Sequence, residues 1–228
     1  MCRAWTLLRA LRRIAAVALV LGVASGGVGV GAMKLPQAWA QADVAPKRHF
    51  KVDRPADLSD ADALSIYSQI LDEVVAGYRL SGDPVAKQYR HWRRYNKAPY
   101  RSATHGERYV NNYANNRAEI YGLFEKADTL PEGSILAKDS FAVTTRGDVF
   151  TGPLFVMEKM AQGFNPASRD WRYVMVMPDG SLFGMTNGPG STRVEFCITC
   201  HEAAGDENDH LFYVPPRYRV RILSVRPQ

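Results

Sequence analysis

Apolar residues after position 56 recur at the three- and four-residue spacing that gives a helix one buried face. Six residues form this series: Leu64, Tyr67, Leu71, Val74, Val75 and Tyr78. Asp57 or Ser59 can cap the start of the predicted helix, and Gly82 is placed to end it. Asp83 followed by Pro84 predicts a second helix, because aspartate favours the N-cap and proline the first helical position.

The pattern changes after Arg108, where short apolar stretches bounded by turn residues predict strands. These stretches are 109–113, 134–143, 154–160 and 171–177, and a helix through Leu123 follows the first of them. Short turns at 146–148 and 178–181 leave no helical crossovers between the later strands, so the sheet is predicted to be antiparallel. We therefore expect an α+β fold, with a signal segment at 1–40, a helical arm at 41–88 and a mainly antiparallel β domain at 89–228.

A C-x-x-C-H motif lies near the end of the chain and consists of Cys197, Cys200 and His201 with the two residues between the cysteines. This is the attachment sequence of c-type haem, in which the cysteines bond to the porphyrin and the histidine ligates the iron. The motif predicts one covalent haem c, carried by a short helix over 194–203. A thioredoxin-like redox motif is the alternative, but that motif belongs early in a βαβ unit, and none surrounds it here.

The N-terminus has the three regions of a secretory signal peptide. Four arginines precede an uncharged stretch over 14–33, and Ala38-Trp39-Ala40 offers a cleavage site of small residues. An uncleaved membrane anchor is the alternative, because this stretch is long enough to span a bilayer. Its five glycines weaken it as a helix and favour cleavage after Ala40 or Ala42. The protein is therefore expected to be periplasmic, and c-type haem is attached outside the cytoplasm in bacteria.

Charge and cysteine content change once the signal segment is removed. Five of the 29 basic residues lie in the first 40, which hold no acidic residue, so 24 basic and 23 acidic residues remain, a formal net charge of +1. Such a balance gives no support to nucleic-acid binding. Cys2 leaves with the signal, so the two motif cysteines are the only thiols left and no disulfide framework is expected.

Two charged residues interrupt the predicted strands on otherwise apolar faces. Alternation places Lys138 on the face of Leu136, and Glu158 on the face of Leu154 and Val156. A carboxylate or amine buried there must be paired, hydrogen-bonded or shifted in pKa, as in a reactive pocket. Alternation leaves two other readings open: these faces turn to solvent, or the two residues pair with each other.

Four ordered segments of the chain resemble the cytochrome P-460 family. They are GSILAKDSF at 133–141, LFVMEKM at 154–160, DWRY at 170–173 and FCITCH at 196–201. The resemblance runs from about Tyr89 to Pro216 and does not cover the helical arm. It implies a mostly antiparallel β fold, typically a homodimer, and a high-spin c-type haem with a proximal histidine and an open distal side.

The resemblance also implies roles for five residues. Cys197 and Cys200 would be the thioether cysteines and His201 the proximal ligand. Lys138 falls where the family's lysine bonds to a porphyrin meso carbon, and Glu158 falls where a distal carboxylate assists proton transfer from substrate. The implied activity is oxidation of hydroxylamine, or a similar small nitrogen compound, toward nitrous or nitric oxide. The electrons would pass to another exported cytochrome.

Two other functions remain open at this stage. The related cytochromes c′-beta share the fold, lack the lysine cross-link and bind small gases such as nitric oxide. An electron carrier would instead fill the sixth iron position with a methionine, for which Met175, Met177 and Met185 are candidates, although apolar strands favour a core role for them. The isolated histidines, His49, His91 and His105, are more typical of surface or hydrogen-bonded residues than of iron ligands.

Overall fold

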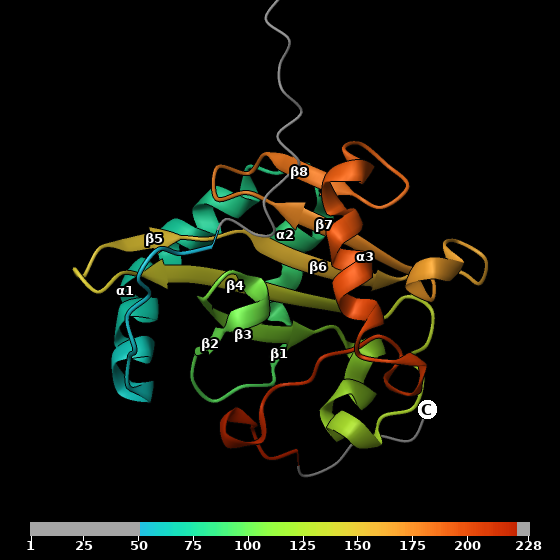
Figure 1. Cartoon of the computed structure of the whole chain (residues 1–228), viewed down its shortest axis with the longest axis horizontal. Coiled ribbons are helices and arrows are strands. Elements are labelled where there is room, and N and C mark those ends of the chain that lie inside the picture. The colour runs from blue at the N-terminus through green and yellow to red at the C-terminus, as the bar shows by residue number, and fades with distance from the viewer. Residues whose placement is uncertain (1–50, 223–228) are drawn as a thin grey trace, which may run out of the picture. The chain divides into compact units, whose positions relative to one another are not determined.

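The computed structural model describes residues 51–222, which lie within a compact unit formed by Val44–Gln228 (Figure 1). The predicted signal peptide at 1–40 lies outside the described residues. Over residues 51–222, no helix combines the length and the apolar character needed to cross a membrane.

An eight-stranded antiparallel sheet forms the centre of this unit, as predicted. Its order is β1-β3-β4-β6-β7-β8, with β2 pairing β3 and β5 pairing β4. The strands are β1 (Arg93–Arg94), β2 (Tyr100–Ser102), β3 (Arg108–Ala114), β4 (Ile135–Val143), β5 (Val149–Thr151), β6 (Leu154–Lys159), β7 (Trp171–Val176) and β8 (Leu182–Met185). The four long strands are those expected from the sequence. The four shorter ones have at most four residues, too few for alternation to distinguish them from loops.

Helices α1 and α2 cover one face of the sheet. Helix α1 (Asp60–Arg79) is capped by Ser59, whose side chain accepts from the backbone N–H of Asp62, and α2 (Pro84–Gln88) is capped by Asp83. Both caps agree with the sequence prediction. The buried stripe of α1 differs slightly from it, because Leu64 is 37% exposed and Ala63 packs inward instead.

The opposite face of the sheet is covered by later parts of the chain. Helix α3 (Glu195–Glu202) lies over this face with a series of 3-10 turns and the irregular C-terminal segment (Figure 1). The 3-10 turns of the described chain are η1 (Tyr89–His91), η2 (Ala103–His105), η3 (Asn116–Lys126), η4 (Pro166–Ser168), η5 (Ser191–Val194), η6 (Asp206–Asn208) and η7 (Pro216–Tyr218). Both faces of the sheet are therefore buried. A charged residue on an apolar strand face can thus point either toward α1 and α2 or toward α3.

The strand register fixes which residues share each face. Lys138 lies opposite Asn112 of β3 on one side and Phe155 of β6 on the other. Because directly opposed residues point to the same face, these three side chains form a row across the sheet. Ala137 and Val156 form the neighbouring row, which points to the opposite face and packs with the residues of α1 and α2.

Candidate haem site

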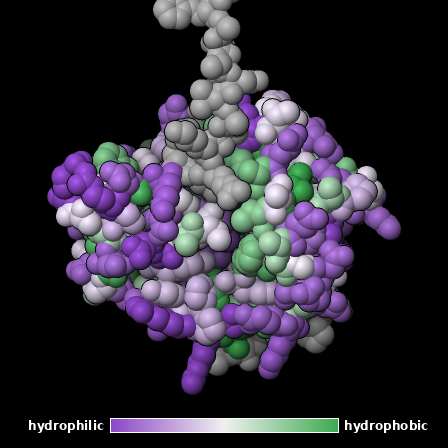
Figure 2. Space-filling model, in the orientation of Figure 1, coloured by the Kyte–Doolittle hydropathy of each residue, from purple (hydrophilic) through white to green (hydrophobic). Residues whose placement is uncertain are grey.

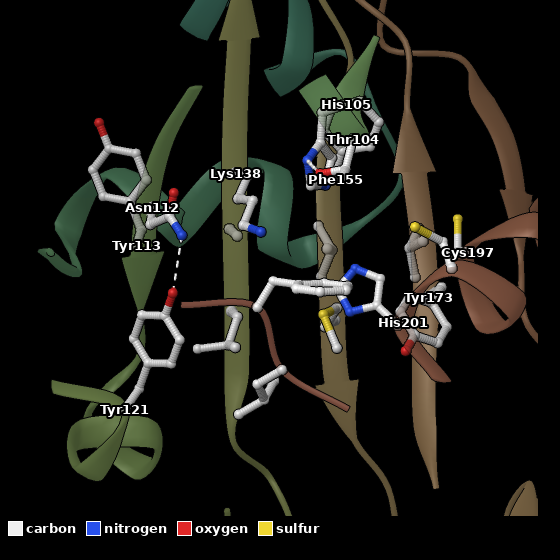
Figure 3. A pocket seen from close by; sticks show the side chains of 18 residues that line it. Thr104, His105, Asn112, Tyr113, Tyr121, Lys138, Phe155, Tyr173, Cys197 and His201 are labelled. Carbon is white, nitrogen blue, oxygen red and sulfur yellow. Dashed lines mark hydrogen bonds between the residues drawn. The ribbon is translucent and has the colours of Figure 1, made fainter. Parts of the chain in front are cut away.

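A cavity lies between the sheet and α3, and its walls are predominantly apolar (Figure 3). Leu136, Phe155, Met157 and Tyr173 contribute from the sheet, and the loop after α3 closes it with Leu211. The C-x-x-C-H motif and Lys138 both line this cavity.

Helix α3 presents the three motif residues to the cavity. Cys197 and His201 are buried, Cys200 is half-buried, and neither cysteine takes part in a disulfide. Burial, with Cys200 nearby, raises the pKa of the Cys197 thiol to about 12. Positions 197, 200 and 201 lie within about one helical turn, so a single short helix brings both thiols and the imidazole to one wall. The expected helix is confirmed, with its bounds at 195–202.

The imidazole of His201 is held in one orientation. Its Nδ1 lies 2.8 Å from the backbone oxygen of His210, and Tyr173 and Phe212 pack against the ring at centroid distances of 5.2 and 5.4 Å. A carbonyl oxygen only accepts, so Nδ1 carries the proton and Nε2 of the neutral ring carries the lone pair. This hydrogen bond is the usual arrangement for a metal-ligating histidine, because it sets the tautomer and orients the ring.

The carbonyl of His210 is positioned by a buried ion pair in the same loop. Asp209 is 2% exposed, and its Oδ1 lies 2.6 Å from Nζ of Lys159 on β6. The second carboxylate oxygen accepts from the backbone N–H of Leu130, and the carbonyl of Asp209 accepts from the Trp171 indole. No local sequence pattern predicts this network, because residues 209 and 159 are 50 positions apart and neither belongs to a recognisable motif.

Lys138 points into the cavity from the middle of β4 (Figure 3). Desolvation in the cavity lowers the pKa of its amine to about 8, with the Cys200 thiol acting in the opposite direction. The neutral, nucleophilic form of this amine is therefore more available near neutral pH than that of an exposed lysine. Lys138 shares its face of the sheet with Leu136, as alternation predicted.

Glu158 does not reach the cavity, and the structure corrects the expectation that it lies beside the iron. It shares a face with Leu154 and Val156, as alternation predicted, but that face packs against α1 and α2. The carboxylate is half-buried and forms an ion pair with Arg172, its neighbour on β7. Both faces of the sheet are apolar, so the apolar neighbours of Glu158 on its strand could not show which face carries the cavity.

We expect Glu158→Gln to leave the haem spectrum and substrate oxidation unchanged. The substitution removes a partly exposed ion pair with Arg172 that is worth about 0–1 kcal/mol. Thermal unfolding and turnover of the variant, measured beside the wild type, check this. A large loss of turnover with unchanged stability would show that Glu158 acts in the reaction despite its position.

Several cavity residues were absent from the predicted site. Phe155 follows from the register opposite Lys138, and Asn112 donates a 2.9 Å hydrogen bond to the Tyr121 hydroxyl at one end of the cavity (Figure 3). His105, predicted to be a surface or hydrogen-bonded histidine, is buried and also lines the cavity. Met175, Met177 and Met185, considered as possible sixth ligands, do not line it.

The residues present fit a c-type haem. Two thiols and an imidazole on one helix form the donor set, and the enclosing side chains are largely apolar, as a porphyrin requires. On the surface, Figure 2 shows apolar residues gathered over the region of α3 on a face that is otherwise mostly hydrophilic. Cys197 and Cys200 would attach the porphyrin, His201 would ligate the iron, and the iron would supply the redox chemistry.

An antiparallel sheet that carries such a cavity beneath a C-x-x-C-H helix defines a cytochrome of the α+β class. The sequence model of the cytochrome P460 family matches residues 86–213, which is more than half of the 228 residues. The chain therefore belongs to the cytochrome P460 family, as the sequence resemblance suggested. A comparison with curated proteins found no match. Membership implies a haem protein associated with oxidoreductase chemistry.

Proposed function

We propose that the protein is an exported mono-haem c-type cytochrome that oxidises hydroxylamine, or a similar small nitrogen compound, at an open haem iron. One observation carries this proposal: the amine of Lys138 lies in the same cavity as the C-x-x-C-H motif. An amine in this cavity would supply a third covalent link to the porphyrin, the link that distinguishes hydroxylamine-oxidising members from gas-binding cytochromes c′-beta. The sequence-level signal peptide supports export to the periplasm.

The chain's own residues supply orientation and exclusion of water. Cys197 and Cys200 would fix one edge of the porphyrin, and His201 would hold one face of the iron through a ring anchored on the His210 carbonyl. Phe155 and Met157 enclose the cavity from the sheet and keep bulk water from a small substrate. Electrons would leave to another exported cytochrome, and a homodimer is part of the proposal.

An optical spectrum of the purified holoprotein tests the cross-link. We expect a ferrous Soret band shifted far to the red, and Lys138→Ala should return it to an ordinary c-type position. Hydroxylamine oxidation, followed with an artificial electron acceptor, should fall roughly 10- to 100-fold, the usual cost of altering a group that tunes a metal site. Lys87→Ala, at an exposed lysine of α2, is the matched control.

A second measurement makes the covalent link explicit. After proteolysis, mass spectrometry of the wild type should find the Lys138 peptide joined through haem to the Cys197 peptide. An ordinary ferrous spectrum and a free Lys138 peptide would contradict the hydroxylamine oxidase and favour the gas-binding function. Fractionation and N-terminal sequencing of the product test export and cleavage after Ala40 or Ala42.

A further inference from the structure

Three buried polar side chains form a hydrogen-bonded chain at the β3 end of the cavity. The Tyr100 hydroxyl donates to the side-chain oxygen of Asn112 at 3.0 Å, and the Asn112 amide nitrogen donates to the Tyr121 hydroxyl at 2.9 Å (Figure 3). The three residues are 6%, 2% and 1% exposed, respectively. Asn112 and Tyr121 line the otherwise apolar cavity, where a polar group is costly unless it is hydrogen-bonded.

The direction of this chain leaves one proton facing the cavity. A tyrosine hydroxyl has a single proton to donate, and Tyr100 donates its own to Asn112. Tyr121 accepts from Asn112, and its own proton has no acceptor among residues 51–222. Because buried donors in folded proteins are almost always paired, we expect the acceptor to belong to the molecule that the cavity binds.

Aromatic neighbours fix the position of the Tyr121 ring. The ring lies 5.2 Å from that of Tyr95, at an interplanar angle of 81°, and 5.5 Å from that of Tyr213 in the C-terminal segment. Asn112 orients the hydroxyl from the sheet. The donor is therefore held in place before any ligand binds, which lowers the entropic cost of using it.

This donor lies across the sheet from the C-x-x-C-H motif. Asn112 is on β3, and β4 and β6 separate this strand from β7. The motif is at the β7 side, where the Tyr173 ring packs against that of His201. Three strand spacings of about 4.8 Å separate β3 from β7, roughly 14 Å in all. Figure 3 likewise shows Asn112 and Tyr121 on one side of the cavity and Cys197 on the other.

A porphyrin attached through two thioether bridges has its two propionates at the opposite edge of the ring. In this cavity that edge would face the Tyr121 hydroxyl. The propionate oxygens are the hydrogen-bond acceptors of the porphyrin rim, and a carboxylate is a stronger acceptor than a neutral group. We infer that Tyr121 donates a hydrogen bond to a haem propionate, and that Asn112 and Tyr100 are its positioning residues.

This inference rests on the covalent haem of the proposed function and adds a carboxylate-binding site at the edge that the cysteines do not hold. The hydrogen bond would also reduce the negative charge that the propionate presents to the iron. Hydrogen bonding around a haem is one of the means by which a protein sets its reduction potential. Without this bond the ferric state is favoured, so we expect a lower reduction potential in Tyr121→Phe than in the wild type.

Resonance Raman spectroscopy of the holoprotein tests the hydrogen bond without using activity. We expect Tyr121→Phe to shift the propionate bending band to lower frequency. Asn112→Leu should broaden the band, because the hydroxyl keeps its proton but loses the group that orients it. Tyr95→Phe is the matched control and should leave the band unchanged, because Tyr95 is a buried neighbour of Tyr121 that does not line the cavity.

A crystal structure of the wild-type holoprotein tests the same contact directly. We expect the Tyr121 hydroxyl oxygen to lie about 2.5–3.0 Å from a propionate oxygen. The inference is overturned if both propionates point away from Tyr121 and a water accepts its proton, or if Tyr121→Phe leaves the propionate band unchanged. Since the wild-type structure decides the first outcome alone, the test does not depend on the stability of the variants.

The inference and the proposed activity can fail separately. A protein whose propionate band shifts in Tyr121→Phe, but which does not oxidise hydroxylamine, would remove the proposed activity and keep the carboxylate-binding site. A wild type that oxidises hydroxylamine, with a propionate band that does not respond to Tyr121→Phe, would keep the activity and remove the site.

Discussion

Replacing Asp209 with asparagine is expected to lower the free energy of unfolding by about 3–5 kcal/mol, the usual cost of removing one partner of a buried ion pair. The substitution leaves the ammonium of Lys159, whose side chain is 10% exposed, without its carboxylate. The backbone conformation at Asp209 and His210 makes this loop more sensitive to loss of the ion pair. Both residues have positive φ, at 50° and 58°, a conformation that the ion pair and its hydrogen bonds help to hold.

The effect should extend to the iron, because the same loop supplies the carbonyl that accepts from Nδ1 of His201. A weaker hydrogen bond makes the imidazole a poorer electron donor, which favours the ferrous state. We therefore expect a higher reduction potential in Asp209→Asn than in the wild type. Denaturant unfolding monitored at the Soret band measures the stability, and redox titration of the folded protein measures the potential.

Asp206→Asn is the matched control for this prediction. Asp206 lies in the same loop and pairs with Arg169 and with the His210 ring, but its side chain is 76% exposed. A pair of this kind contributes about 0–1 kcal/mol, so the control should remain close to the wild type. Equal stability losses in the two variants would show that the loop tolerates the missing charge and that Asp209 does not specifically position His201.

The sequence was sufficient for the elements with strong local signals. Apolar stretches bounded by turn residues identified β4 and β6, and the spacing of Cys197, Cys200 and His201 identified both the helix and the cofactor chemistry. Lys138 was found because a charge in an apolar strand is costly unless its surroundings use it. In each case the deciding information lies within one segment of the chain.

The remaining site depends on contacts between distant segments, which a local pattern does not encode. Glu158 was misplaced because the arm helices bury the second face of the sheet, so both faces looked like a core. His105 and Asp209 had no motif around them. His105 lines the cavity from η2, and Asp209 lies in the loop after α3 whose His210 carbonyl accepts from His201. Alternation gave the face of a residue but not what covers that face.

Replacing Asp139 with leucine is expected to detach the arm helices from the sheet. Asp139 is fully buried on β4 and accepts hydrogen bonds from the hydroxyls of Tyr67 on α1 and Tyr89 in η1, and from the Asn111 side chain. Leucine would remove the carboxylate that accepts from these three buried donors, at about 1–3 kcal/mol for each donor left unpaired. That loss approaches the 5–15 kcal/mol by which a typical domain is stable, so α1 should lose hydrogen-exchange protection before β6 and β7.

The pH dependence of stability gives Asp139 a distinct signature. Burial raises the pKa of its carboxyl above the ordinary value, so the folded state holds this proton at pH values where the unfolded chain has lost it. The resulting stabilisation is complete below the unfolded pKa of about 4 and is lost as the pH rises through the folded pKa. Asp139→Asn cannot titrate and should remove this part of the slope.

Asp148→Asn is the control for the pH series, because its carboxylate lies on the exposed turn between β4 and β5 and pairs with Arg146. Its pKa is lowered, mainly by the Thr144 hydroxyl, so any contribution it makes has the opposite sign. Urea unfolding of all three proteins across the acid range measures the slopes. If Asp139→Asn keeps the wild-type slope, the buried carboxyl is not the titrating group.

Lys138 directly precedes Asp139 on β4 and points to the other face of the sheet. The Asp139 variants therefore also test whether the packing of α1 and α2 on the sheet keeps the Lys138 amine in the cavity.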